Sequence, residues 1–232
     1  AGFPSPATDY MENKLDLNQN SSKLLTIIAN IKGARHACDF HEIDYLGFPL
    51  SISEEFQKCN TNKDIHQALR LVEEIQNLAI NNNKELIVYL SMAFGNPYQE
   101  FYHPDLVAKL TSKLDDIEIR TISLADTIGV SNPENITQIF STLIPLYPHI
   151  EFGAHFHSTI DTCHQKINTA FENGCRRFDS TIKGYGGCPM ANNKLVGNIP
   201  TEELLLRFED AKSCLNMTEF YLAVNKFEQL LM

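Results

Sequence analysis

The sequence lacks any apolar run long enough to cross a bilayer, which excludes a transmembrane helix on sequence grounds. It is also short of positive charge, because 19 lysines and arginines stand against 29 acidic residues and leave a net charge of −10. An acidic surface repels phosphate backbones and anionic lipids, so we expect neither a nucleic-acid nor a membrane partner. An anionic ligand, such as a carboxylate or a CoA ester, would then need a local positive charge or a metal ion.

The spacing of a disulfide scaffold is absent as well. Six cysteines are scattered along the chain: Cys38, Cys59, Cys163, Cys175, Cys188 and Cys214. A chain of 232 residues can fold without covalent cross-links, so reduced thiols are expected. Residues 1–6 have neither the basic region nor the apolar core of a signal peptide. These features favour the cytoplasm over export, although a mitochondrial matrix protein without its transit peptide would look the same.

Runs rich in Ile, Val, Leu and Tyr alternate with helical patterns along most of the chain. The runs predict strands at residues 24–30, 42–49, 85–94, 118–127, 149–157 and 176–183. The clearest helix has an apolar stripe from Ile65 to Leu78, a second begins with Asn132 and Pro133, and a third ends at Gly174. Strict alternation of strand and helix predicts parallel βα units.

A doubly wound sheet and a closed (β/α)8 TIM barrel both fit this order. No glycine-rich nucleotide-binding motif follows any strand, which removes the usual evidence for the open sheet. The six units leave room for about one more at the N-terminus, just short of the eight that a TIM barrel requires. We therefore predict an α/β protein with a single TIM-barrel domain over residues 1–232, closed by a helix over 217–232.

Polar residues or glycines follow each predicted strand, where TIM barrels carry their chemistry. The segments are 30–33, 47–49, 95–98, 126–127, 155–157 and 184–189. Six such ends in succession indicate a constructed site. Asp126 ends an otherwise buried strand, so its carboxylate must be paired, solvated or functional.

His155 and His157 are two residues apart on a predicted strand, so both imidazoles project to the same face, with their Cα atoms about 6–7 Å apart. That spacing lets two nitrogens converge on one cation. The alternative is one core histidine and one loop histidine, since H-x-H often occurs by chance; the position at the mouth of a barrel favours a metal. Mg, Mn, Zn and Co all suit two imidazoles with oxygen ligands, and spacing does not choose among them.

Cys188 lies in the segment Gly184-Tyr-Gly-Gly-Cys-Pro, where glycines allow the backbone to move. Beside a cation, a thiol has a lowered pKa and can transfer protons. The alternative is a buried small hydrophobe, which is our interpretation of the other five cysteines. A zinc site formed by Cys38 and His41 has little support, because no second pair has ligand spacing.

Four motifs in the region 24–206 together resemble the 3-hydroxy-3-methylglutaryl-CoA (HMG-CoA) lyase family, within the metal-dependent TIM-barrel lyases and Claisen-type synthases. They are SMAFGNPY at 91–98, SLADTIG at 123–129, AHFH at 154–157, and GYGGCPMA at 184–191 followed by GN at 197–198. The H-x-H strand is shared with the synthases, whereas the G-x-G-G-C-P loop is characteristic of the lyase.

The resemblance implies a role for each residue of the site. The metal ligands would be His155, His157 and Asn198; the catalytic residues Cys188, which closes over the substrate, and Asp126; and the substrate-binding residues Thr127, Gly186, Gly187 and Asn96. The implied cofactor is a divalent metal ion, with Mg or Mn ahead of Zn or Co, and the implied assembly is a homodimer. The implied reaction is the retro-Claisen cleavage of an acyl-CoA, HMG-CoA, to acetyl-CoA and acetoacetate, with Cys188 protonating the enolate.

The chain departs from the family pattern in three places. Ser158 stands where the family has Asp, and a hydroxyl cannot hold a histidine as a carboxylate does. The interval from Cys188 to Asn198 is about one residue longer. No equivalent of the first strand, with its arginine and metal-binding aspartate, precedes Ala1, so we expect a barrel without its first strand and part of its second. A synthase or aldolase on the same scaffold, or a non-catalytic barrel, are the alternatives.

Overall fold

The computed structural model describes residues 22–187, 196–212 and 215–231. Six strands lie side by side in chain order and every neighbouring pair is parallel. They are β1 (Leu24–Ile27), β2 (Ile43–Ser51), β3 (Glu85–Ser91), β4 (Thr121–Asp126), β5 (Glu151–Ser158) and β6 (Arg177–Phe178). A seventh, β7 (Gly197–Asn198), pairs antiparallel with β5. The predicted strand order and the parallel pairing are confirmed.

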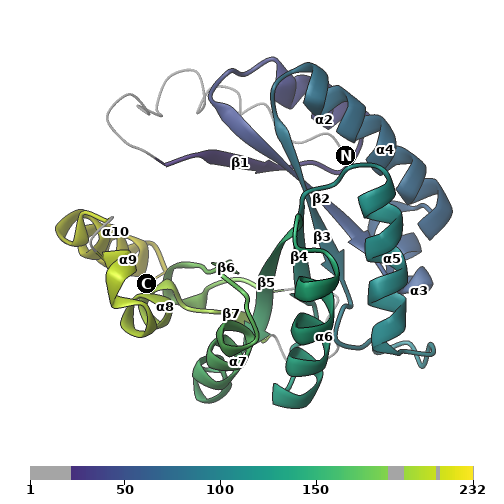
Figure 1. Ribbon diagram of the computed structural model, residues 1–232. Coiled ribbons are helices and arrows are strands. Elements are labelled where there is room, and N and C mark those ends of the chain that lie inside the picture. Colours follow the sequence, from purple (N-terminus) through teal and green to yellow (C-terminus); the bar gives the residue numbers. More distant parts are fainter. Residues whose placement is uncertain (1–21, 188–195, 213–214, 232) are drawn as a thin grey trace.

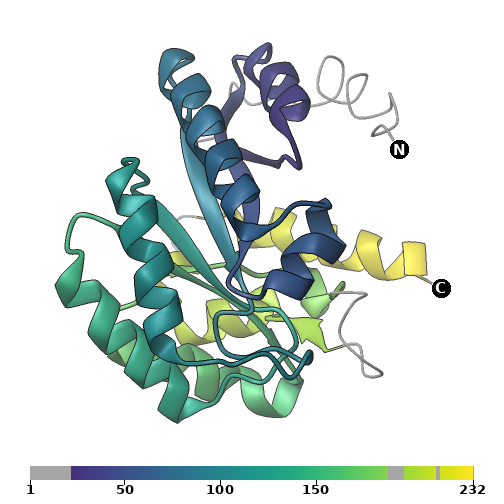
Figure 2. The same cartoon turned by 90° about the vertical axis from the view of Figure 1, so that its right-hand side faces the viewer.

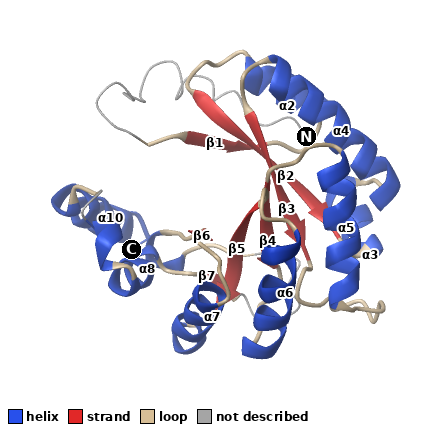
Figure 3. Ribbon diagram, viewed as in Figure 1, coloured by secondary structure: helices blue, strands red, loops and turns tan. Residues whose placement is uncertain are grey.

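Helices cover the outer, convex face of this curved sheet (Figure 1, Figure 3). They are α2 (Ile31–Cys38), α3 (Glu54–Thr61), α4 (Ile65–Asn81), α5 (Pro104–Asp116), α6 (Pro133–Leu146) and α7 (Ile160–Glu172). In the turned view of Figure 2, the helices from α4 to α7 follow one another along that face. The arrangement is part of a (β/α)8 barrel, as the alternation of strand and helix predicts.

Local chemistry sets the helix boundaries. The predicted start of α6 is confirmed: the Asn132 side chain accepts hydrogen bonds from the backbone N–H groups of Glu134 and Asn135, and Pro133 occupies the first turn. Asn30 was expected to extend the first strand, but that strand ends at Ile27 because the Asn30 side chain caps α2.

The sixth predicted strand is much shorter than expected. It covers Arg177–Phe178 and is followed by a short 3-10 helix, η1 (Ile182–Gly184). Lys183 and Gly184 have φ angles of 57° and 64°, which turn the chain out of the extended conformation. β6 itself ends before this point, at Phe178, and the glycine-rich segment continues as a loop after the turn at 183–184.

After β7 the chain forms α8 (Thr201–Arg207), α9 (Glu209–Lys212) and α10 (Met217–Leu231). The predicted closing helix is α10. It contacts the glycine-rich segment, since Lys183 Nζ lies 2.8 Å from Glu228 Oε1 and the rings of Tyr185 and Phe227 have centroids 5.3 Å apart. Within the described ranges, the structure has no helix with the length and apolar character of a membrane span.

The main core lies between the sheet and its outer helices. The strand residues that face it are buried and apolar; they include Leu46, Phe48, Leu50, Val88, Leu90, Ile122, Leu124 and Phe156. Each such burial contributes roughly 1.5–3 kcal/mol. Strand residues of the opposite parity face the concave side, where polar side chains such as Ser123 and His157 lie among apolar ones such as Ile87. The predicted burial of Cys163 and Cys175 is confirmed, but for Cys59 it is wrong, because that thiol is exposed on α3. Cys38 is half-buried.

Candidate active site

His155 and His157 lie near the carboxyl end of β5 and face the concave side of the sheet. Their ring centroids are 5.4 Å apart, with an angle of 65° between the ring planes. The His157 residue is 6% exposed, and the His155 side chain is 31% exposed. The geometry thus keeps both imidazoles on one face, as their spacing predicts, with one of them still open to solvent.

Hydrogen bonds set the tautomer of each ring. His155 Nδ1 lies 3.1 Å from Asp179 Oδ2, and His157 Nδ1 lies 3.2 Å from the Val196 carbonyl oxygen. Both partners accept, so each Nδ1 is the nitrogen that carries a proton, and in the neutral form of either ring the lone pair is on Nε2. Burial is the main cause that lowers the pKa of His157, which favours its neutral form. Two neutral imidazoles with free Nε2 atoms are the form that binds a metal ion.

Asn198 is brought next to His157 by β7. The antiparallel pairing of β7 with β5 sets these two residues opposite each other. Asn198 Nδ2 donates to the Tyr185 carbonyl oxygen at 3.1 Å, so the amide oxygen is the atom left to bind a cation. The segments around Gly184 and Gly197 can approach each other this closely because glycine has no Cβ. A Cβ on Gly184 would lie 2.7 Å from the Asn198 carbonyl oxygen, and one on Gly197 would lie 2.8 Å from the Gly184 carbonyl oxygen.

The donor set suits a divalent cation: two imidazole nitrogens and an amide oxygen are ligands that borderline and harder ions accept. In the part of the chain that the structure describes, no cluster of three or more His, Cys, Asp or Glu side chains could hold a metal ion. Among the described residues, Cys38 and His41 therefore belong to no such group. A metal at the histidine pair would therefore take Asn198 as its third ligand, and further oxygens from water, substrate or other residues.

Asp179 is a site residue that the sequence motifs did not reveal. Its Oδ2 accepts the His155 Nδ1–H, and also the Ser123 hydroxyl at 3.0 Å. A carboxylate from the segment after β6 thus holds His155, although Ser158 stands where the family pattern has Asp. The register of the two strands could have revealed this contact. Arg177 and Phe178 of β6 pair with Gly153 and Ala154 of β5, so the next residue, Asp179, lies beside His155.

Tyr89 packs beside the same histidine. Its ring meets His155 edge to face, with centroids 5.6 Å apart. Burial, assisted by the charge of Asp179, raises the pKa of Tyr89 to about 12. The phenol therefore stays protonated at neutral pH and can donate a hydrogen bond, but it cannot act as a base there.

Asp126 faces away from the histidines. It is in register with Phe156, whose side chain packs against Phe140 of α6, so Asp126 points into the helix layer. The residue is 1% exposed, and its oxygens accept from two backbone N–H groups, a hydroxyl and an ammonium. These contacts favour a positioning role over contact with reacting atoms; its catalytic role stays a prediction.

The predicted substrate-binding residues lie on loops beside these strand ends. Thr127 Oγ1 accepts from Met92 N at 2.9 Å, which ties the ends of β4 and β3 together. Asn96 Oδ1 accepts from the backbone of Tyr98 and Glu100, so it shapes its own loop. Gly186 has a φ of 95°, a left-handed conformation.

Gly187 is half-buried and leads toward Cys188. Cys188 itself lies outside the described residues. The substrate-binding roles of these residues and the catalytic role of Cys188 stay predictions.

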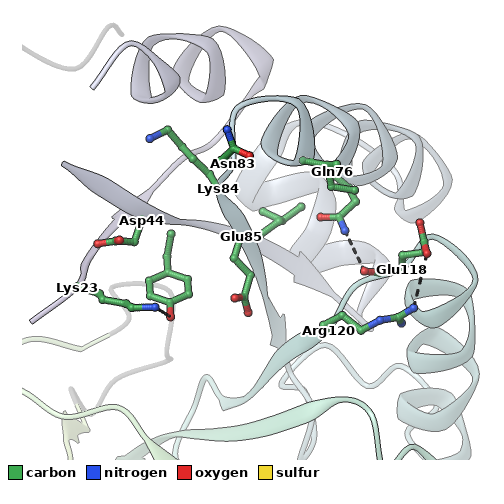
Figure 4. A pocket seen from close by; sticks show the side chains of 11 residues that line it. Lys23, Asp44, Gln76, Asn83, Lys84, Glu85, Glu118 and Arg120 are labelled. Carbon is green, nitrogen blue, oxygen red and sulfur yellow. Dashed lines mark hydrogen bonds and ion pairs between the residues drawn. The ribbon is translucent and has the colours of Figure 1, made fainter. Parts of the chain in front are cut away.

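A cavity of about 510 Å³ lies at the opposite, amino end of the strands (Figure 4). Its charged side chains already have partners: Lys23 Nζ lies 3.3 Å from the Tyr45 hydroxyl, and Arg120 lies 2.8 Å from Asp115. In TIM barrels this end serves stability, whereas the carboxyl ends carry the chemistry. The histidine end is therefore the candidate active site.

Comparison with known proteins shows the family to which the chain belongs. A family model described as HMGL-like matches residues 1–227. The chain is 30% identical over 199 residues to a hydroxymethylglutaryl-CoA lyase of Bacillus subtilis, covering 85% of this chain and 63% of that protein. Across several curated relatives, the chain spans between 47% and 63% of their length.

Solved structures are similar to this chain as well. The crystal structure of the Bacillus subtilis HMG-CoA lyase matches with a TM-score of 0.84 at 27% identity, covering 95% of this chain and 74% of the other. An HMG-CoA lyase from Acinetobacter baumannii, in complex with coenzyme A and 3-methylmalate, matches with a TM-score of 0.77 at 27% identity, covering 88% and 66%.

Proposed function

The chain belongs to the HMGL-like family, and from that premise we propose that it is a metal-dependent carbon–carbon lyase. Its substrate in this proposal is HMG-CoA or a close analogue, and its products are acetyl-CoA and acetoacetate. The observation that carries the proposal is the paired histidine geometry: both Nδ1 atoms face acceptors, so the lone pair of each neutral ring is on Nε2, and Asn198 lies opposite His157 on β7.

The metal would be held by His155 Nε2, His157 Nε2 and Asn198 Oδ1. When bound, a divalent ion (Mg or Mn ahead of Zn or Co) supplies Lewis-acid polarisation of substrate oxygens, which makes a tertiary hydroxyl easier to deprotonate. The two Nδ1 acceptors, Asp179 Oδ2 and the Val196 carbonyl, orient the rings toward it.

The proton chemistry is proposed for the glycine-rich loop. A general base takes the hydroxyl proton and the C2–C3 bond then breaks, which yields acetoacetate and the enolate of acetyl-CoA. The Cys188 thiol would then deliver its proton to C2 of that enolate. Gly186 and Gly187 bring backbone close to the substrate without side-chain hindrance, while Thr127 and Asn96 shape the neighbouring loops.

The proposal extends to organisation and location. Residues 1–232 are taken as a single catalytic domain that acts as a homodimer on an acyl-CoA. A cytoplasmic location is preferred to the mitochondrial matrix. Similar mammalian lyases include one named cytoplasmic and one named mitochondrial. Cell fractionation of a tagged form of this protein is therefore the direct test of its location.

The test of the function is a pair of assays on the full-length protein with added Mn²⁺ or Mg²⁺. We expect acetoacetate to form from HMG-CoA. Its formation is measured by coupling it to an enzymatic reduction of the acetoacetate. Condensation of acetyl-CoA with a 2-oxo acid, without cleavage, would instead identify a synthase. A protein that retains no divalent metal by elemental analysis and catalyses neither reaction would be the non-catalytic barrel.

Asp179→Asn is expected to weaken metal binding by about 10- to 100-fold, the usual cost of losing a carboxylate that orients a ligating histidine. An amide holds the His155 Nδ1–H less strongly than a carboxylate does. The measurement is a Mn²⁺ titration of the metal-free protein. Asp161→Asn, an exposed carboxylate on α7, is the matched control. Equal affinity in the two variants would contradict the role of Asp179.

A further inference from the structure

Lys166 is a buried lysine that reaches from α7 to the end of β5. The residue is 4% exposed. Its ammonium donates to Asp126 Oδ2 at 2.7 Å, to the His157 carbonyl oxygen at 2.8 Å and to the Gly129 carbonyl oxygen at 3.2 Å. An ammonium has three donors, and all three are used.

Asp126 completes this buried network from the other side. Besides Lys166, its carboxylate accepts from Val130 N at 2.8 Å, Ser131 N at 3.1 Å and Ser131 Oγ at 2.6 Å. The ion pair thus connects the end of β4, the turn at 129–131, β5 and α7. Its acceptors and donors are satisfied within the protein, so the network is a closed structural unit.

Stability alone is a weak reason for this pair. Taking two charges out of water costs several kcal/mol per ion, and apolar residues of similar volume often serve as well or better. The pair lies, however, at a special point of the sheet. The ladder between β4 and β5 ends at Asp126 and Phe156, one residue before His157. Lys166 binds the carbonyl of that next residue, where the ladder to β4 has stopped.

The neighbouring residue, Ser158, pairs with Gly197 of β7 but adds no side-chain hydrogen bond to the helix layer among the described residues. Ser158 Oγ is buried without a hydrogen-bond partner within the described part of the chain. The backbone at His157 is thus paired with Asn198 of β7 and is also held from the helix layer by the ammonium of Lys166. Its ring is held by the Val196 carbonyl.

We propose that Lys166 is a positioning residue for His157. With Asp126 as its counter-ion, it fixes the peptide carbonyl of His157 to α7 and thereby sets the angle at which the imidazole meets the metal. This inference rests on the metal site of the proposed function, but it does not depend on which acyl-CoA is cleaved.

The test removes the charges of Lys166 and Asp126 singly and together, which separates an effect on His157 from an effect on the stability of the fold. Lys166→Met and Asp126→Asn each leave one buried charge unpaired, so both should lower the thermal midpoint markedly. The double variant Asp126→Asn/Lys166→Met has no unpaired charge and should recover most of that loss. It still lacks the donor to the His157 carbonyl, so its Mn²⁺ affinity should remain about 10- to 100-fold below that of the parent.

Lys84→Met is the matched control. Lys84 also donates to two backbone carbonyls, those of Phe40 and Ile43 at 2.7 and 2.6 Å, but near the amino ends of the strands. It should lower stability without changing Mn²⁺ affinity. A double variant that binds Mn²⁺ like the parent would overturn the proposal, and so would a Lys84 variant that loses affinity to the same extent.

A second readout works on the metal-free protein. Nitrogen-15 NMR of the imidazoles reports which nitrogen carries the proton. We expect a single Nδ1–H tautomer of His157 in the parent and in Lys84→Met, and a tautomer mixture in the double variant. An unchanged tautomer in the double variant would overturn the proposal. If the parent bound no Mn²⁺, the proposed function would fail, whereas this tautomer comparison would still decide the role of Lys166.

Discussion

Replacing His157 by alanine is expected to abolish stoichiometric metal binding and to lower the rate of HMG-CoA cleavage by at least about 10³-fold. The substitution removes one of the three proposed metal ligands. In the parent protein, the Val196 carbonyl holds the ring of this ligand. Lewis-acid stabilisation by a metal is worth several kcal/mol, and about 4 kcal/mol corresponds to 10³ in rate. Elemental analysis after dialysis and an acetoacetate assay measure the two effects.

The controls must separate loss of the metal from loss of the fold, because His157 is only 6% exposed. His155→Ala removes the partner ligand from a more accessible position and should give the same metal loss with less effect on stability. His66→Ala, on the exposed face of α4, should change neither quantity. Full metal occupancy in both ligand variants would contradict the proposed site.

Sequence reasoning predicted the fold well because its signals are local. Strand and helix periodicities repeat within a few residues, and the order of βα units follows directly from them. The H-x-H spacing likewise predicts a shared face without any tertiary information. The ends of some elements moved: the Asn30 cap shortened the first strand, and the sixth covers only Arg177–Phe178. The two-residue strand β7 was not predicted.

The contacts that complete the candidate site are non-local, and this is why the motifs missed some of them. Asp179 reaches His155 through the register of β6 on β5, and Asn198 reaches His157 through an antiparallel pairing that no local pattern announces. The orientation of Asp126 also depends on register, since its in-register partner Phe156 fixes the face.

Lys166 was hidden by a different ambiguity. A lysine in an amphipathic helix is ordinarily interpreted as solvated, and long side chains of this kind usually extend to the surface. Here the Lys166 side chain turns inward because Asp126 and two backbone carbonyls accept hydrogen bonds from its ammonium. A buried acid at a strand end is therefore a reason to look for a cation on the following helices.

Replacing Cys188 by alanine is expected to lower the rate of cleavage by about 10²- to 10⁴-fold, the usual contribution of a positioned proton donor. Metal occupancy should stay at the parental level, because the proposed ligands are His155, His157 and Asn198. Cys188 is outside the described residues, so this role rests on the family motif and on the position of Gly186, whose Cβ site lies 3.2 Å from Asn198 Nδ2.

Two further substitutions make the Cys188 result interpretable. Cys188→Ser keeps the size of the side chain but replaces the thiol by a much weaker acid, so it should recover little of the lost rate. Cys59→Ala removes an exposed thiol on α3 and should leave turnover intact. A Cys188→Ala protein that loses its metal would move the cysteine into the ligand set, and one with parental turnover would remove it from the chemistry. Retained metal with lost turnover is the result that the proton-transfer role requires.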